Sequence, residues 1–131
     1  MEAVAAYCLS KKGAFKDYPF GPEPLVMKVG GKMFALLSEG PEKVEISLKC
    51  DPVIAENLRE QHEAVRPGYH LNKKHWNTVT VMSALAQDEL FAMIDHSYTL
   101  VVSKLPKAVR SEITGEGARN TEAPEANNRL Q

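Results

Sequence analysis

The sequence predicts an α+β fold, in which one mostly antiparallel sheet of five or more strands packs its apolar face against helices in a two-layer sandwich. Three observations favour this class. A Gly30-Gly31 pair separates two β-rich runs, residues 44–50 alternate strictly between apolar and polar side chains, and helical spacing of apolar residues returns after residue 88. The order helix, three strands, helix, two strands and helix leaves the second face of the sheet open to solvent.

The first elements follow from local signals. Apolar residues at helical spacing over 2–12, ended by Gly13, predict a short helix. Prolines and glycines within 15–24 predict an irregular loop, held down by its aromatic residues. Strands are expected at 25–29 and 32–37, joined by a two-residue turn, because both central positions of such a turn can need positive φ.

The later elements are equally local. Asp51 followed by Pro52 predicts a helix start, since the carboxylate can cap free amides and proline at the first position loses no hydrogen bond. A second hairpin is expected, with strands over 69–71 and 75–81. From residue 88 onward, apolar spacing predicts one helix or two in tandem.

Length and composition indicate one domain. The chain has 131 residues, 44% of them hydrophobic, and we expect the domain to span residues 1–110. Residues 111–131 lack aromatic and periodic apolar content, which predicts a disordered tail. No stretch is apolar enough to span a bilayer and no leader is evident, so we expect a cytoplasmic protein without a membrane partner, most simply a monomer. The net charge of −1 provides no general attraction to nucleic acid.

Cysteines and histidines do not form a metal-site pattern. Cys8 and Cys50 lie far apart in apolar patterns that are typical of reduced, buried thiols. His70 and His75 flank one turn but lack a third ligand, and no serine or threonine has a base at a recognisable spacing. We therefore expect no metal, no cofactor and no catalytic residues, and thus a non-enzymatic protein.

The leading functional hypothesis is binding of double-stranded DNA. The window 64–87 contains basic residues and no acid, and lysines at a turn can contact phosphates while an exposed tryptophan can stack on a base. If Val79 points into the core, period-two geometry places Trp76 on the open face beside Lys49. The candidate contacts lie on two hairpin tips and the open face: Lys28, Lys32, Lys49, Asn72, Lys73, Lys74 and Trp76.

Two other interpretations stay open. In the first, the turn lysines are only solvated or prevent edge pairing of the sheet, and Trp76 packs at the margin of the core. In the second, an aromatic cleft binds a small molecule or a peptide. The residues expected to line that cleft are Tyr69, His70, Trp76 and Phe20.

Four segments carry a family resemblance. They are DYPFGPEPLVMKVGGKMFALL (17–37), ISLKCDP (46–52), PGYHLNKKHWNTV (67–79) and SYTLVVSKLP (97–106). In order and spacing they resemble the MmcQ/YjbR family of small bacterial proteins over nearly all of residues 1–110. The resemblance implies a frataxin-like (CyaY-like) sandwich and a DNA-binding role. Frataxins bind iron through an acidic ridge, whereas the first helix here has Glu2 as its only acid, which disfavours iron delivery.

Overall fold

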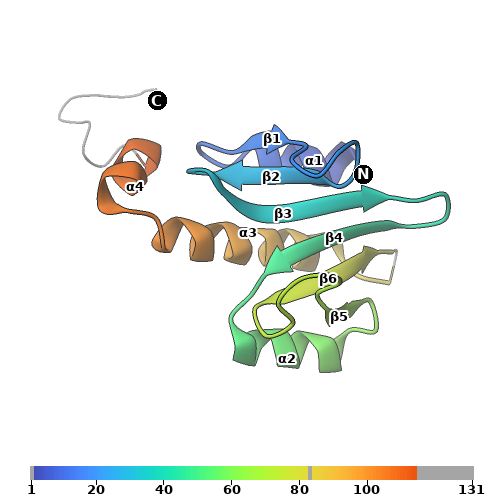
Figure 1. The fold of residues 1–131 in the computed structure, drawn as a ribbon. Coiled ribbons are helices and arrows are strands. Elements are labelled where there is room, and N and C mark those ends of the chain that lie inside the picture. The colour runs from blue at the N-terminus through green and yellow to red at the C-terminus, as the bar shows by residue number, and fades with distance from the viewer. Residues whose placement is uncertain (1, 83, 115–131) are drawn as a thin grey trace.

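Within residues 2–82 and 84–114, which the computed structural model describes, a six-stranded antiparallel sheet is flanked by four helices (Figure 1). The strand order is β1-β2-β3-β4-β6-β5. The predicted α+β class and mostly antiparallel sheet are therefore confirmed. The strands are β1 (Phe15–Asp17), β2 (Leu25–Val29), β3 (Lys32–Glu39), β4 (Val44–Lys49), β5 (Val65–Pro67) and β6 (Trp76–Val81). The helices are α1 (Glu2–Leu9), α2 (Pro52–Gln61), α3 (Gln87–Ser103) and α4 (Lys107–Thr114).

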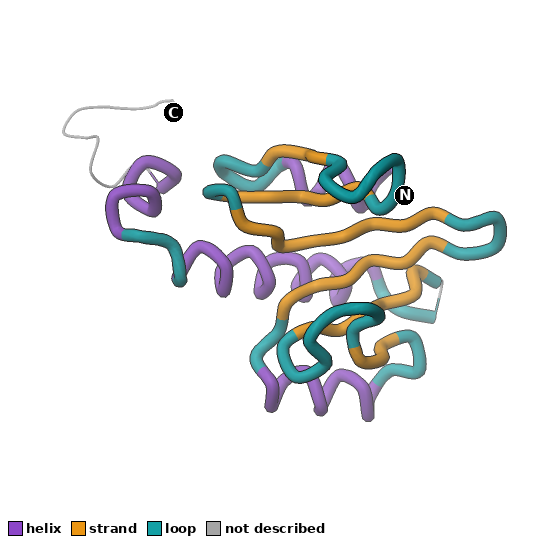
Figure 2. The backbone as a smooth tube through the Cα atoms, viewed as in Figure 1, coloured by secondary structure: helices purple, strands orange, loops and turns teal. Residues whose placement is uncertain are grey.

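One face of the sheet, here called the inner face, packs against helices. Helix α3 runs across it and contacts β2, β3 and β4, while α1 contacts α3 and α2 contacts β5 (Figure 2). Alternate strand residues face this layer and exclude water. The buried strand residues in this core include Met27, Val29, Ala35, Leu37, Ile46, Leu48 and Val79. Helix α3 contributes Leu90, Met93, Ile94, Val101 and Val102.

Two predicted local signals are confirmed. Gly30 and Gly31 have φ of 59° and 81° and join β2 to β3. A Cβ added to Gly30 would lie 2.6 Å from Leu105 Cδ1, so this turn also needs glycine for close packing. At the start of α2, the Asp51 carboxylate accepts hydrogen bonds from the backbone N–H groups of Val53 (3.0 Å) and Ile54 (3.4 Å), as the helix-cap prediction requires.

Strand β3 contains a bulge that α3 stabilises. Met27 pairs with Ala35 and Lys28 pairs with Met33, which leaves Phe34 as the extra residue. The buried Ser97 hydroxyl of α3 donates to the Phe34 carbonyl (2.6 Å) and accepts from the Lys49 N–H (2.9 Å). One serine therefore ties α3 to two strands.

The second hairpin differs from its prediction. The strand that pairs with β6 is Val65–Pro67, not 69–71, and the chain from 68 to 75 is a loop. Pro67 had indicated a break, but at the edge of a sheet its missing N–H costs no ladder hydrogen bond. Gly68 N–H then donates to the Trp76 carbonyl (2.9 Å), after which the chain leaves the ladder.

The segment 15–24 also departs from expectation. Its first three residues form the edge strand β1, which pairs with β2. The aromatic residues predicted to hold the loop down are solvent-exposed, since Phe15, Tyr18 and Phe20 expose 46%, 50% and 61% of their surface. They are therefore available for contacts other than core packing.

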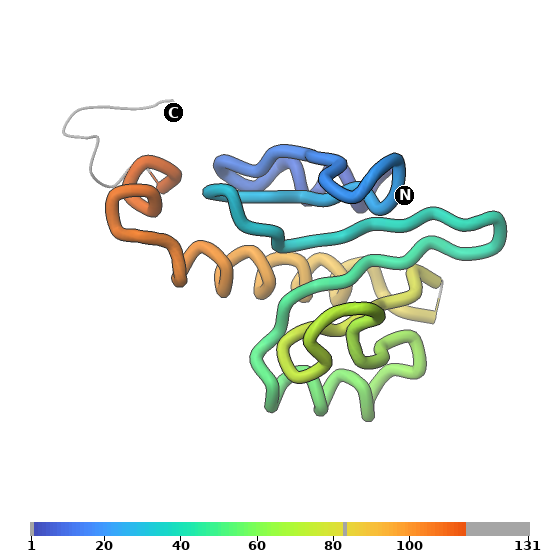
Figure 3. Tube along the Cα trace, in the orientation of Figure 1, coloured from blue at the N-terminus to red at the C-terminus, as the bar shows by residue number. Residues whose placement is uncertain are grey.

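The late helical segment is confirmed as two helices in tandem, α3 and α4, which follow one another along the trace in Figure 3. Helix α4 continues past Arg110 to Thr114, and Ile113 packs against the core. The ordered domain thus extends beyond the predicted boundary at 110, and the rest of the predicted tail, 115–131, lies outside the described residues. In the part of the chain described, no helix combines the length and apolarity needed to cross a bilayer.

Candidate functional site

The face of the sheet opposite the helices, the outer face, carries a cavity of about 340 Å³ that we call the outer hollow. Its floor comes from β3, β4 and β6, and its walls from the loop 18–24 and the loop 68–75. The predicted open face is therefore partly covered. The lining residues are Phe20, Pro24, Leu36, Ser38, Glu45, Ser47, Tyr69, His70, Leu71 and Thr78.

The register of β4 and β6 builds the floor. Glu45 pairs with Thr80, Ser47 with Thr78, and Lys49 with Trp76, and directly opposed residues in an antiparallel pair share a face. The prediction that Trp76 lies beside Lys49 is confirmed. The predicted exposure of Trp76 is wrong, because this residue is only 9% exposed and lies so close to Gly68 that a Cβ added to the glycine would be 2.8 Å from the Trp76 Cβ.

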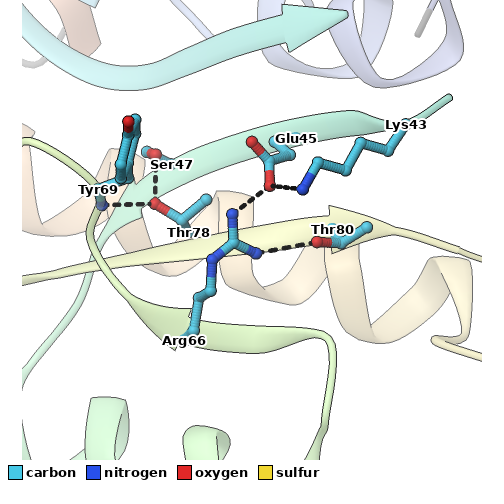
Figure 4. Close-up of polar contacts among 7 residues, drawn as sticks. All are labelled: Lys43, Glu45, Ser47, Arg66, Tyr69, Thr78 and Thr80. Carbon is cyan, nitrogen blue, oxygen red and sulfur yellow. Dashed lines mark hydrogen bonds and ion pairs between the residues drawn. The ribbon is translucent and has the colours of Figure 1, made fainter. Parts of the chain in front are cut away.

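A buried pair of hydroxyl groups lies at the centre of the floor (Figure 4). Ser47 Oγ and Thr78 Oγ1 are 2.8 Å apart, and the Tyr69 backbone N–H donates to Thr78 Oγ1 (3.0 Å). This last bond holds the loop 68–75 against β6 and explains why the face is covered there. Thr78 is 2% exposed and Ser47 is 9% exposed.

Charged residues form one end of the floor. Figure 4 shows the Arg66 guanidinium contacting Glu45 and also donating to Thr80 Oγ1 (3.0 Å), while Lys43 Nζ lies 3.3 Å from Glu45 Oε2. Burial alone would raise the pKa of Glu45, but the hydrogen bonds and charges of Arg66 and Lys43 outweigh it and hold the pKa below its ordinary value. Two cations thus surround one carboxylate.

Exposed aromatic groups form the rim of the outer hollow. Tyr69 is 64% exposed, and its ring centroid lies 3.9 Å from that of His70. His70 has φ of 61°, a left-handed conformation that a residue other than glycine adopts infrequently. Phe20 reaches the same cavity from the other loop. Three of the four residues predicted to form an aromatic cleft therefore meet here, and Trp76 does not line this cavity.

A second, more polar hollow of about 570 Å³ lies where β4 ends and β6 begins, and we call it the end hollow. Three of the predicted DNA contacts, Lys49, Asn72 and Trp76, line it together. They are joined by Lys104 from the end of α3, which was not among the predicted contacts, and by Asp51.

The other four predicted DNA contacts are dispersed. Lys28 Nζ pairs with Asp17 Oδ2 (2.9 Å), and Lys73 Nζ donates to the Gly68 carbonyl (2.9 Å), so both ammonium groups have partners within the domain. Lys32 beside the Gly-Gly turn and Lys74 in the 68–75 loop are exposed.

The two cysteine thiols are buried and unreactive. Burial raises the pKa of Cys8 to about 12 and that of Cys50 to about 11, so both remain protonated near neutral pH. Among the described residues, no group of three or more His, Cys, Asp or Glu side chains is placed to hold a metal ion.

Sequence reasoning did not select the residues that form the floor of the outer hollow as site residues. Ser47 and Thr78 are adjacent only because β4 pairs with β6, and they are 31 positions apart in the chain. Arg66 lies on a three-residue strand that no pattern indicated. The one available signal was the period-two alternation of β4, which correctly placed Glu45 and Ser47 on the same face.

The fold and its outer hollow define a small α+β domain with a ligand-sized cavity on a sheet face. The model of the YjbR family matches residues 9–100, and the chain belongs to this family, as the sequence motifs predicted. The uncharacterized protein YjbR of Escherichia coli strain K12 is 38% identical over 104 residues, which cover 79% of this chain and 88% of that protein. The uncharacterized protein YbdF of Escherichia coli O157:H7 is 41% identical over 90 residues, covering 69% and 74%.

Solved structures agree with this assignment. The crystal structure of Deinococcus radiodurans protein DR2400, described as a DUF419 domain, superposes with a TM-score of 0.80 at 37% identity and covers 86% of each chain. A Pseudomonas syringae protein superposes with a TM-score of 0.67 at 27% identity, covering 76% of this chain and 96% of its own.

Proposed function

We propose that this protein is a non-enzymatic, cytoplasmic binding protein that holds a small organic molecule in the outer hollow. The observation that carries the proposal is the cavity itself. Its volume of about 340 Å³ and its apolar walls, with a few polar groups at the floor, are typical of small-molecule sites. The left-handed backbone at His70, on the rim, adds support, because such conformations cluster at ligand-binding positions.

Binding without catalysis is favoured by the partners of the floor hydroxyls. Ser47 and Thr78 hydrogen-bond to each other, Thr78 also accepts from the Tyr69 backbone N–H, and neither hydroxyl bonds to a histidine or carboxylate within the described residues. A serine or threonine nucleophile needs such a base. The floor is therefore suited to orienting a ligand.

Titration of ¹⁵N-labelled protein with a set of small aromatic compounds tests this proposal. Amide shifts are expected at Ser47, Tyr69 and His70. Tyr69→Ala should weaken binding about fivefold, the equivalent of ~1 kcal/mol for one aromatic contact. Tyr18→Ala is the matched control, because Tyr18 is similarly exposed at 50% but does not line the cavity. The absence of shifts around the cavity with every compound would refute the proposal.

A second candidate, binding of double-stranded DNA, is favoured by the end hollow. Lys49 and Lys104 meet there beside Asn72, and lysine ammonium groups bind phosphates without regard to base sequence. The buried Trp76 does not stack on a base in this proposal, so it rests on backbone contacts alone. A frataxin-like (CyaY-like) arrangement, with one helix-free sheet face, is part of this same proposal.

Salt dependence tests the DNA candidate. Fluorescence anisotropy with a duplex should give an affinity that falls steeply with salt, and the double variant Lys49→Ala/Lys104→Ala should flatten the slope of log affinity against log salt by up to about 2. Lys43→Ala is the control, because Lys43 precedes β4 and so lies at the opposite end of that strand from Lys49. No binding at low salt would refute this candidate.

A further inference from the structure

In the hydrogen bond between Ser47 and Thr78 beneath the outer hollow, the surrounding groups determine which hydroxyl donates and which accepts. We propose that Thr78 donates its hydrogen to Ser47, that the Ser47 hydrogen is thereby left to point into the outer hollow, and that the cavity selects a planar aromatic ligand carrying an acceptor oxygen. This inference rests on the proposed small-molecule function and goes further by naming the ligand class.

The direction follows from what each hydroxyl can reach. Thr78 Oγ1 already accepts from the Tyr69 N–H, and its own hydrogen still needs an acceptor. Thr78 is 2% exposed, and the acceptor available to it among the described residues is Ser47 Oγ, 2.8 Å away. If Ser47 donated instead, the Thr78 hydrogen would be buried without an acceptor, which is the costlier arrangement.

Ser47 is then the last member of a chain of donors. The chain runs from the Tyr69 N–H through the Thr78 hydroxyl to the Ser47 hydroxyl, and Ser47 lines the cavity. Each hydroxyl that donates also accepts, which polarises the next donor in the chain. A ligand oxygen that accepts from Ser47 is therefore favoured over a ligand group that only donates.

The rest of the cavity defines the ligand further. Tyr69 and His70 offer neighbouring ring faces, and Phe20 lines the cavity from the opposite loop, which suits a flat aromatic ring. At the charged end, Glu45 lines the cavity and is paired with Arg66 and Lys43, which do not line it, so the three side chains together carry a net positive charge. A carboxylate is thus tolerated as well as an amide carbonyl. We expect the ligand to be an aromatic carboxylate or carboxamide.

Three probes of similar size test this selection by NMR titration: benzoate, benzamide and aniline, the last of which lacks an acceptor oxygen. Wild-type protein should bind benzoate and benzamide about fivefold more tightly than aniline, the usual worth of one hydrogen bond. Ser47→Ala should remove this preference. Ser38→Ala is the matched control, since Ser38 also lines the cavity from β3 but does not belong to the donor chain, and it should keep the preference.

The outcomes separate the two proposals. If Ser47→Ala keeps the preference, or if Ser38→Ala loses it, the direction of the hydroxyl chain is wrong although the cavity still binds ligands. Equal binding of all three probes by the wild type likewise overturns the selection alone. If no probe shifts the amides of Tyr69 and His70, both proposals fail. Should Ser47→Ala not fold, Ser47→Cys retains the volume with a weak donor, and the same loss of preference is expected.

Discussion

On strands β4 and β6, alternate residues face the helices and the residues between them face the loops. The inner side presents Ile46, Leu48 and Val79, which are at most 2% exposed and pack into the continuous core under α3. The outer side presents Glu45, Ser47 and Thr78, which are polar and lie under a cavity instead of a helix. The same two strands thus separate an apolar layer that stabilises the fold from a polar layer that lies next to a cavity.

The serine hydroxyls on the two sides of the sheet also differ in their hydrogen-bond partners. Ser97, on the inner side, donates once and accepts once within the protein, and its residue surface is fully buried. Ser47, on the outer side, has Thr78 as its hydroxyl partner and lies next to the cavity. A serine that is satisfied internally supports packing, whereas one with unused capacity beside a cavity supports recognition.

The strongest test of this comparison replaces one large aromatic residue on each side with alanine. Phe34 is fully buried and makes an edge-on contact with Tyr98, with ring centroids 5.5 Å apart. Phe34→Ala should reduce the free energy of unfolding by about 3–5 kcal/mol, because it leaves a cavity in the core. Urea denaturation measures the loss.

Phe20→Ala provides the contrast on the outer side. Phe20 is 61% exposed, so its removal should change the free energy of unfolding by no more than about 0.5 kcal/mol. A similar destabilisation by both substitutions would show that the outer hollow is part of the folding core, and the division between the two sides would be lost.

The sequence alone predicts which residues face each side of the sheet only where a strand is long enough to show a period-two alternation. The seven residues from 44 to 50 alternate without interruption, and they correctly predicted which side chains share a face and that Trp76 lies beside Lys49. Strands β1 and β5 have three residues each, too few for a periodic pattern, and they form only because a neighbouring strand offers hydrogen-bonding groups. The sequence therefore missed both edges of the sheet.

The cover on the outer face was unpredictable for a related reason. It depends on the hydrogen bond from the Tyr69 N–H to Thr78 and on the left-handed backbone of His70. Neither has a local sequence signature, because a histidine with positive φ is held by its surroundings. The prediction of an exposed Trp76 failed at this point. Of the four residues predicted to form an aromatic cleft, Tyr69, His70 and Phe20 line the same cavity and Trp76 does not.

Ser97→Ala should reduce the free energy of unfolding less than Phe34→Ala does. The substitution leaves the Phe34 carbonyl and the Lys49 N–H without their side-chain partner in a buried position. We expect a loss of about 1–3 kcal/mol in the free energy of unfolding. Ser103→Ala, which removes an exposed serine of the same helix, is the control and should have little effect. Equal values for both variants would mean that the bridge between α3 and the bulge contributes nothing to stability.

The N-terminal cap of α2, in the connection from β4, should contribute about 1 kcal/mol to the free energy of unfolding. Asp51 caps α2 by accepting from the N–H groups of Val53 and Ile54, so Asp51→Ala should destabilise the domain by that amount. Asp51→Asn can still accept these bonds and should recover most of the loss. If the asparagine variant were as unstable as the alanine variant, the carboxylate charge, not the cap geometry, would account for the effect.

A small, pH-dependent effect on stability is expected at Glu45, the charged group of the outer side. Its pKa in the folded protein is held below its ordinary value, since the opposing effect of burial is outweighed by Arg66 and Lys43. A lowered carboxyl pKa contributes stability above the unfolded pKa of roughly 4.3, and this contribution is lost as the pH falls through the lower folded value. Glu45→Gln cannot titrate, so its stability should fall less steeply than that of the wild type below about pH 4.3.

At pH 7 this variant should be less stable by under about 1 kcal/mol, because the side chains of Arg66 and Lys43 are 41% and 59% exposed and solvent screens their attraction. Urea unfolding at several pH values between 7 and 3 measures both effects, and 0.5 M salt should shrink the difference at pH 7. Glu42→Gln, in the exposed turn before β4, is the control and should follow the wild-type curve. A Glu45→Gln curve parallel to that of the wild type would mean that the ion pairs of Glu45 with Arg66 and Lys43 add nothing to stability.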